Sequence, residues 1–371
     1  MSTEERNKMA KTLGYRQIGK PVPENVTVVD VIKTFPKEVY ELDHSRAWSA
    51  LFLTVSGMVL GFTCVAVSPW YLLPFAWFLA GTASTGLFVL GHDCGHGVFH
   101  EKKWVNDIIG HLVLTPLIYP FEPWRIMHNL HHLHTNKLHK DTGWHPLSVE
   151  EAVEHGPVVY NIIKIFMGSP LRLFLSIVHW VKLHFNPAGF TPKQLKKVCV
   201  SWAVCLAFAV GMWTWLTVTM GFWDGWFKFW FMPWIGYHFW MSTFTLVHHT
   251  APHIPFRSEE NYHGAQAKLG GTVHCDFPKW IQVMCHNINV HVPHHLSVKI
   301  PFYHLEAATD SLRKNWGQYM TEGTINWRMM RNFLTEIHLY EFEKEYVPFD
   351  AGKAREDPLL AVQRRLYPDT I

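Results

Sequence analysis

The chain has 371 residues, of which 48% are hydrophobic and 15% aromatic, while charged residues make up only 17% against roughly 25% in soluble domains. The 33 basic residues nearly balance the 30 acidic ones, so no nucleic-acid-binding patch is expected. The six cysteines form no CxxC pair, which argues against a cysteine-ligated zinc or iron–sulfur site.

The first part of the chain predicts a polar segment followed by a membrane hairpin. Residues 1–46 contain no apolar core of the length that a cleavable signal sequence needs. Two apolar runs follow, approximately Ala47 to Val67 and Trp70 to Leu90, and each has the roughly 20 residues that cross a bilayer. The Ser68-Pro69 turn between them has no Lys or Arg. We therefore expect a transmembrane hairpin at residues 47–90.

The second half of the chain predicts another hairpin at residues 198–248, with apolar runs at approximately Val198 to Gly221 and Trp226 to Val247. In the basic segment before it, residues 91–197, charged residues interrupt shorter apolar stretches, a pattern typical of helices that lie on the membrane surface. Because basic residues are enriched on the cytoplasmic side, residues 1–46, 91–197 and 249–371 are all expected in the cytoplasm, and with them both termini.

Histidines gather into three compact clusters, and all three fall on the predicted cytoplasmic side. On a helix, residues three or four apart share a face, so each cluster can aim its imidazoles at one point. Imidazole binds iron, zinc, copper and nickel, so these side chains predict a metal pair without naming the metal. The eight candidate ligands are His92, His96, His128, His131, His132, His291, His294 and His295.

Four further histidines lie near these clusters. His249 ends the fourth apolar run at the right depth to be a ninth ligand, and His286 is a further candidate, as a ligand from a loop or as a hydrogen-bonding neighbour. His238 lies about 16 Å deeper at 1.5 Å per residue and is expected to be a buried polar residue of the helix bundle. His134 is expected to support the ligands rather than bind metal. The fold class predicted is an all-α integral membrane protein, with four transmembrane helices in two hairpins and a cytoplasmic helical cap that holds the metal pair.

The motifs resemble the three histidine boxes of the membrane fatty-acid desaturases. The resemblance is carried by Gly91-His-Asp-Cys-Gly-His96, by Trp124-Arg125 with residues 128–136, and by residues 286–295. More specifically, the chain is similar over nearly its whole length to the acyl-lipid delta-12 (omega-6) desaturases of cyanobacteria and plastids. The first box, HxxxH, is one residue shorter than the HxxxxH of acyl-CoA desaturases. His291 stands where front-end desaturases have Gln.

This resemblance implies a diiron enzyme of a thylakoid or plasma membrane of the cyanobacterial type. It would use O2 and electrons from an external ferredoxin to convert oleoyl chains of membrane glycerolipids into linoleoyl chains. Lys102, Lys103, Lys137 and Lys140 lie beside the boxes and either attract such an acidic partner or merely follow the positive-inside rule. One departure concerns the ninth ligand: acyl-CoA desaturases have an Asn four residues before the corresponding histidine, and here that position is Thr245.

Three other functions remain open from the sequence. An omega-3 desaturase shares the scaffold and differs in which carbons meet the metals. A hydroxylase, acetylenase or epoxygenase would use the same diiron site and divert the second hydrogen abstraction. A membrane metal transporter or sensor is a more distant alternative, because transport requires polar groups along its path and these apolar runs contain few besides His238.

Overall fold

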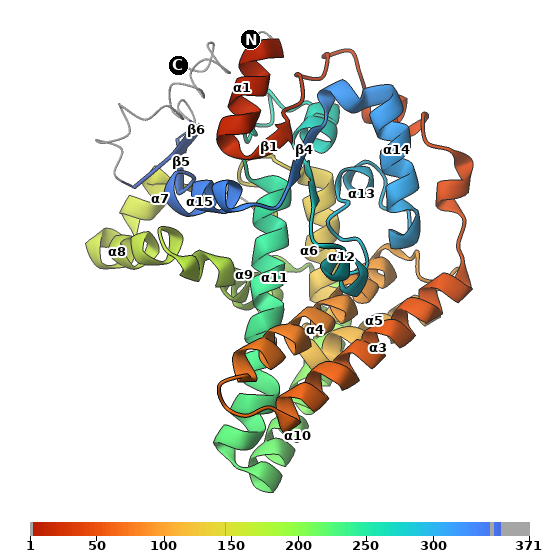
Figure 1. Ribbon diagram of the computed structural model, residues 1–371, viewed down its shortest axis with the longest axis vertical. Coiled ribbons are helices and arrows are strands. Elements are labelled where there is room, and N and C mark those ends of the chain that lie inside the picture. The colour runs from red at the N-terminus through yellow and green to blue at the C-terminus, as the bar shows by residue number, and fades with distance from the viewer. Residues whose placement is uncertain (1–2, 145, 342–344, 350–371) are drawn as a thin grey trace.

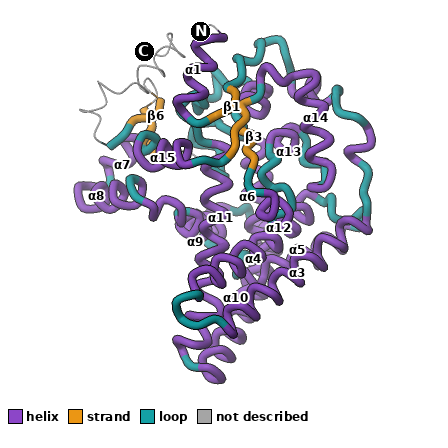
Figure 2. The backbone as a smooth tube through the Cα atoms, in the orientation of Figure 1, coloured by secondary structure: helices purple, strands orange, loops and turns teal. Residues whose placement is uncertain are grey.

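The computed structural model describes residues 3–144, 146–341 and 345–349, and helices dominate it (Figure 1, Figure 2). The α-helices are α1 Thr3–Leu13, α2 Val28–Ile32, α3 His44–Val67, α4 Leu73–His96, α5 Lys103–Leu114, α6 Phe121–His134, α7 Val149–Glu154, α8 Gly156–Met167, α9 Ser176–His184, α10 Pro192–Met220, α11 Met232–His249, α12 Lys279–Met284, α13 Val292–Leu296, α14 Leu305–Trp316 and α15 Trp327–Thr335. Segments of 3₁₀ helix also occur, namely η1 Lys37–Tyr40, η2 Thr115–Leu117, η3 Pro170–Phe174, η4 Pro187–Gly189, η7 Phe302–His304 and η8 Gly317–Tyr319. Two further segments, η5 Phe222–Phe231 and η6 Gln266–Gly270, are π-helical.

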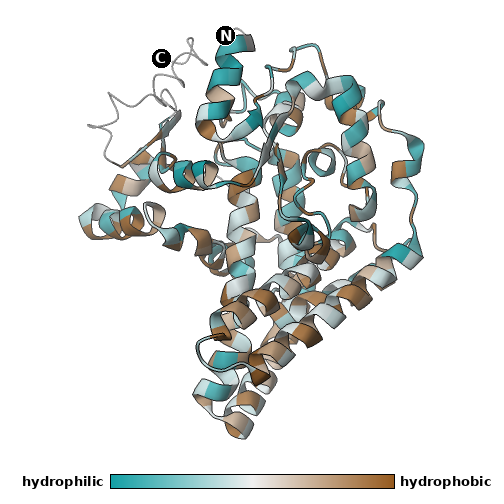
Figure 3. Ribbon diagram, in the orientation of Figure 1, coloured by the Kyte–Doolittle hydropathy of each residue, from teal (hydrophilic) through white to brown (hydrophobic). Residues whose placement is uncertain are grey.

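Within the described residues, three helices are long and apolar enough to cross a membrane, namely α3, α4 and α10. These are the first three runs predicted from the sequence. Much of their apolar surface points outwards, for example Phe52 on α3 and Val218 on α10, which are 75% and 79% exposed. In Figure 3, the ribbon of the helices in the lower part of the molecule carries much of the brown colour that marks hydrophobic residues. An apolar surface of this extent indicates contact with lipid rather than with water.

The fourth predicted run, Trp226 to Val247, is helical but divided and less apolar. Its first residues belong to η5, a π-helical segment, and the rest to α11. The polar side chains of α11, among them His238 and His249, face the protein interior. These polar residues lower the mean hydropathy of α11, which explains why it is not one of the three apolar helices. Their burial keeps them away from lipid.

Helix α4 lies at the centre of the bundle, between α3 and α11 (Figure 1). The backbones of α4 and α11 meet at Gly81 and Gly236, where a Cβ atom added to Gly81 would come within 2.7 Å of Gly236. Only a residue without a side chain permits this approach. As a result, the C-terminal half of α4 is buried almost completely, from Ala80 to Cys94.

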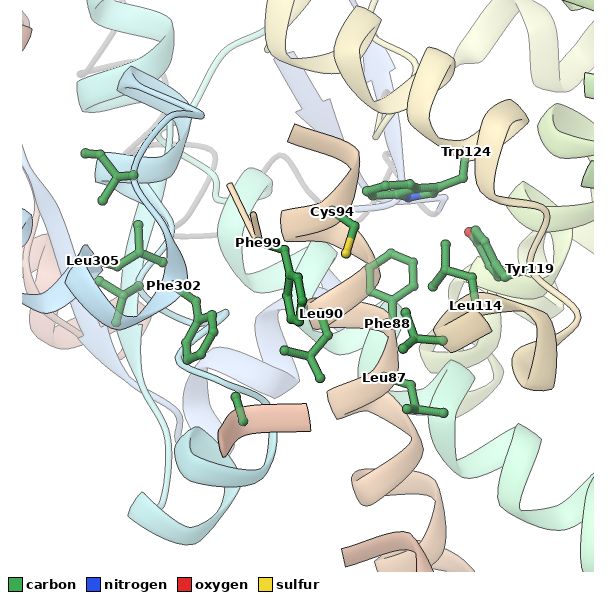
Figure 4. Close-up of a cluster of buried hydrophobic side chains, with 14 of the residues drawn as sticks. Leu87, Phe88, Leu90, Cys94, Phe99, Leu114, Tyr119, Trp124, Phe302 and Leu305 are labelled. Carbon is green, nitrogen blue, oxygen red and sulfur yellow. The ribbon is translucent and has the colours of Figure 1, made fainter. Parts of the chain in front are cut away.

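The hydrophobic core continues from α4 towards both neighbouring layers (Figure 4). Phe88 packs edge to face against Tyr119 and Trp124, with ring centroids 5.4 Å apart in both pairs. Phe302 and Leu305 belong to the same core and come from the C-terminal third of the chain. The core therefore fixes the end of α4 against segments that are far apart in the sequence.

The prediction of an all-α fold is wrong in one respect, because the described residues also form two three-stranded sheets. Strands β1 Tyr15–Gln17, β4 Thr321–Thr324 and β3 Val273–Asp276 form the first sheet in that order. Strands β2 Leu147–Ser148, β5 Leu339–Glu341 and β6 Glu345–Val347 form the second. Pairing is antiparallel for β1–β4 and β5–β6, and parallel for β3–β4 and β2–β5. Segments this short carry too little alternation to be recognised as strands in a sequence.

Candidate metal centre

The last turn of α4 presents His92 and His96 on one face, with their ring centroids 4.7 Å apart. The helix ends at Gly97, whose φ of 71° is in the left-handed region that favours glycine at a helix C-terminus. At Gly95 an added Cβ would lie 2.5 Å from the ring of Trp124. The glycine therefore lets α6 approach α4 closely enough for the first two clusters to meet.

Helix α6 contributes His128, His131 and His132. Trp124, one turn earlier, stacks on His128 with ring centroids 4.8 Å apart and an interplanar angle of 19°. The stack holds the His128 ring in place from outside the cluster. His131 and His132 are buried, at 2% and 6% exposure.

The third cluster is built on α13, a helix of five residues. His291 is its N-cap, and His294 and His295 follow within it. The Nε2 atoms of His291 and His295 are 3.0 Å apart. Just before this cluster, His286 and Asn287 adopt φ values of 47° and 53°. Two successive non-glycine residues in this strained region indicate that the surrounding structure fixes the path of the chain here.

The structure divides the predicted ligands into two adjoining groups. The ligand atoms of each group lie within 4.8 Å of one another. The first group contains His92, His96, His128, His132 and His294, and the second contains His131, His249 and His295. His291 adjoins the second group through the contact of its Nε2 atom with His295. The predicted ninth residue, His249, thus joins the group that also draws on α6 and α13.

Distances within the first group match the spacing of ligands around an ion. The Nε2 atom of His294 lies 2.9 Å from those of His92 and His132, and the Nε2 atoms of His132 and His128 are 3.0 Å apart. Two metal–nitrogen bonds of about 2.1 Å at a right angle place their nitrogens about 3.0 Å apart. The same nitrogens would repel one another if their lone pairs met without a cation between them.

In three of the histidines, a hydrogen bond made by Nδ1 leaves the other ring nitrogen, Nε2, free to bind metal. The Nδ1–H of His131 donates to the Asp141 carboxylate at 2.5 Å, and the Nδ1–H of His92 donates to Asp93 at 3.3 Å. Thr135 donates its hydroxyl hydrogen to a backbone carbonyl, so its oxygen accepts from Nδ1–H of His295 at 3.1 Å. Each of these contacts leaves Nε2 without a proton and directed at the group, as a metal ligand requires.

Burial also favours the neutral, metal-binding form of these rings. It lowers the pKa of His128, His132, His294 and His295 well below the usual value of histidine, and the neighbouring histidines lower it further. All four side chains are therefore neutral at neutral pH. In addition, both ring nitrogens of His96 are buried without a hydrogen-bond partner among the described residues. A bound ion would satisfy one of them, so the residues present fit a pair of metal ions.

The structure places the other predicted histidines outside both groups. The Nε2 atom of His286 lies 2.6 Å from the hydroxyl of Thr54. His238 is fully buried, with Nδ1 2.8 Å from the hydroxyl of Ser176, which confirms its predicted position in the bundle. Thr245, at the position where acyl-CoA desaturases have Asn, donates its hydroxyl hydrogen to the backbone carbonyl of Met241.

Two buried residues of the site were not identified from the sequence. Asp141 follows His131 by ten positions in a loop, a separation that matches no helical or metal-ligand spacing. His248 stacks on His291 with centroids 4.2 Å apart. Its adjacency to His249 was the only available signal, and a pair of neighbouring histidines on a helix points in different directions.

A cavity opens beside the metal centre, between α4, α6, α9 and α11. Most of its lining is apolar or aromatic, including Phe88, Met241 and Leu246. Histidines of both groups reach its wall, His92 and His128 from the first and His131 and His249 from the second. A mainly apolar cavity of this kind suits an apolar ligand.

Fold and site together indicate a membrane protein with two adjoining histidine groups that could hold metal ions beside a mainly apolar cavity. The chain belongs to the fatty acid desaturase family of oxidoreductases, whose family model, "Fatty acid desaturase", matches residues 68–324. The chloroplastic omega-6 fatty acid desaturase of Spinacia oleracea is 47% identical over 368 residues, which cover 99% of this chain and 82% of that protein. The sn-1 oleoyl-lipid 12-desaturase of Anabaena variabilis is 48% identical over 321 residues, which cover 86% of this chain and 91% of that protein. The sn-1 oleoyl-lipid 12-desaturase of Synechocystis is 47% identical over 324 residues, which cover 87% of this chain and 92% of that protein.

Proposed function

We propose that this protein is an O2-dependent diiron desaturase that introduces a cis double bond at carbons 12 and 13 of oleoyl chains in membrane glycerolipids. The observation that carries the proposal is the pair of adjoining histidine groups at the wall of an apolar cavity. The names of the relatives, omega-6 desaturase and oleoyl-lipid 12-desaturase, supply the substrate and the position.

Nitrogen ligands alone do not choose among iron, zinc and copper, and membership of the desaturase family favours iron. His92, His96, His128, His132 and His294 would hold one ion, while His131, His249, His295 and the adjoining His291 would hold the other. The bound metals would supply the oxidant from O2 that removal of hydrogen from an unactivated methylene requires.

The protein's own residues bind and orient the acyl chain. Phe88, Met241 and Leu246 give the cavity a surface that favours methylene groups over water. Asp141, Asp93 and Thr135 accept hydrogen bonds from three of the imidazoles and hold these rings in the orientation that metal binding needs. Holding the chain against a rigid site selects which carbons react, because a reacting group must be placed within a fraction of an ångström.

Product analysis tests the reaction. We expect a host whose lipids contain oleate but no linoleate to accumulate linoleoyl lipid when it expresses this chain. The fatty acids are measured by gas chromatography with mass spectrometry, and the double-bond positions by derivatisation. A new double bond at the omega-3 position, or a hydroxy acid in place of linoleate, would show that one of the related activities is correct and this one is wrong.

The membrane arrangement is part of the proposal: four crossings, with residues 1–46, 91–197 and 249–371 in the cytoplasm. It is supported by Figure 1, where the α3–α4 and α10–η5 turns lie in the lower part of the molecule, away from α13, α14 and the N-terminus. The exposed apolar surface of α8, for example Val158 at 72% and Ile165 at 60%, suits a helix on the membrane surface.

Cysteine labelling tests this arrangement in a background where the exposed Cys199 is replaced by serine. We expect single cysteines at Glu4, Lys102 and Lys314 to react with an impermeant maleimide from the cytoplasmic side. Cysteines at Trp70 and Asp224 should react from the opposite side only. Labelling at Lys102 and Asp224 from the same side would contradict four crossings.

We further propose an external ferredoxin as the electron donor, as expected for this family. The structure gives limited support to the predicted lysine surface. Lys137 and Lys140 both form ion pairs with Glu259, and Lys103 forms one with Asp107. Three of the four predicted cations are thus partly neutralised, which weakens their attraction for an acidic partner.

A further inference from the structure

Arg172 is a fully buried arginine in the wall of the cavity that contains the histidines. It lies on η3, between the surface helix α8 and α9. Its Nη1 atom donates to the backbone carbonyls of Phe333 and Ile337, at and beyond the end of α15. Its Nε and Nη2 atoms are buried and have no hydrogen-bond partner among the described residues.

No acidic side chain in the described part of the chain forms an ion pair with this guanidinium. The ionisable neighbour that acts on Arg172 is the hydroxyl of Tyr346, not a carboxylate. Burial lowers the pKa of Arg172 to about 10, so the guanidinium keeps its proton at neutral pH. A buried cation with unused donors is costly unless an acceptor completes its shell.

Trp144 adds a third unused donor at the same place. Its ring lies 5.7 Å from the Arg172 guanidinium carbon, and it lines the same cavity. Its Nε1–H is buried and has no hydrogen-bond partner among the described residues. Arginine and tryptophan side chains donate hydrogen bonds and accept none. The cluster therefore suits a ligand group that only accepts, such as a carbonyl, ester or phosphate oxygen.

We propose that Arg172 and Trp144 bind the ester carbonyl of the lipid whose acyl chain occupies the cavity. The proposal rests on the acyl-lipid substrate given above and adds the site that holds its polar end. An ester carbonyl is the acceptor nearest to the apolar chain, and η3 follows α8, which has the exposed apolar surface of a membrane-surface helix. The chain can then extend from the donors towards the histidines within one cavity.

An ester-to-ether comparison tests this site independently of turnover. The probes are dioleoyl galactolipid, which has no phosphate, dioleoyl phosphatidylglycerol, which has one, and the ether analogue of each, in which methylenes replace the ester carbonyls. Binding is measured in detergent by displacement of a fluorescent acyl lipid. We expect the wild type to prefer the ester lipid by about tenfold or more, as a hydrogen bond to a charged group supplies.

The variants separate recognition from a structural role. Arg172→Gln should lose most of the ester preference, and Trp144→Phe, which removes one neutral donor, should reduce it by about two- to tenfold. Ether-lipid affinity should be unchanged in Trp144→Phe. Arg331→Gln, the same substitution on the exposed surface of α15, is the matched control and should keep the full preference.

Two outcomes would overturn the inference. Equal losses for ester and ether lipids in both variants would show that Arg172 only anchors α15. An effect confined to phosphatidylglycerol, absent with the galactolipid, would assign the donors to a headgroup phosphate. By contrast, a wild type that prefers the ester lipid but forms no linoleate would reject the proposed reaction and leave this binding site standing.

Discussion

Replacement of His294 by alanine is expected to remove iron from the first group and lower desaturation by at least about 100-fold. The Nε2 atom of His294 lies 2.9 Å from those of both His92 and His132, so it is central to that group. Its loss leaves four imidazoles around a vacancy in the buried site. Iron per chain, measured by mass spectrometry after purification with ferrous iron, should fall from two to about one or less.

The control for this variant is His44→Ala. His44 is exposed, pairs with Glu101 and belongs to neither of the two buried groups. It should keep both irons and full activity, and both variants should insert into the membrane in normal amounts. Wild-type iron content and activity in His294→Ala would exclude His294 as a ligand.

The long apolar helices were predictable because a run of about 20 apolar residues can be recognised in the sequence itself, without knowledge of contacts between distant segments. The first predicted run and α3 both end at Val67. The second run was expected to end at Leu90, whereas α4 continues to His96. Polar residues mark the end of a run in a sequence, but here the histidine-bearing turn stays helical because its side chains are buried against α6 and α13. Helix α4 therefore continues beyond its apolar run and includes the two histidines.

The spacing of the histidines identified candidate ligands but not their partition between two groups. His131 and His132 are adjacent in sequence and belong to different groups. Consecutive positions on a helix point about 100° apart, so α6 lies between the groups and serves both. Which face meets α4 and which meets α11 depends on how the helices cross, and a single sequence does not contain that information.

The small sheets and the supporting contacts depend on pairings between distant segments. Strand β3 pairs with one edge of β4, where Val273 lies opposite Thr321, and β1, from the N-terminal part of the chain, pairs with the other edge of β4. Likewise, the Asp93 carboxylate accepts from the backbone N–H of Phe302, more than two hundred residues away. Neither kind of contact has a local pattern, so the sequence could not reveal them.

Asp141→Asn should weaken iron binding by about 10- to 100-fold without removing a ligand. Asp141 is buried, at 2% exposure, and accepts the Nδ1–H of His131 at 2.5 Å. It also accepts from the backbone N–H groups of Asn136 and Gly143. Asparagine is nearly the same size and can keep some of these contacts. It has no negative charge, however, so it no longer fixes the proton on Nδ1 or strengthens Nε2 as a donor to the metal.

Competition with a ferrous chelator measures this effect, and Asp310→Asn is the matched control because the Asp310 side chain is 77% exposed. The chelator concentration that removes half of the iron should fall in Asp141→Asn and stay unchanged in Asp310→Asn. Thermal unfolding separates metal affinity from loop stability: the two variants should differ more with iron bound than without it, since binding stabilises only the folded state. If Asp141→Asn retained iron as tightly as the wild type, the carboxylate would serve only to close the loop between His131 and Gly143.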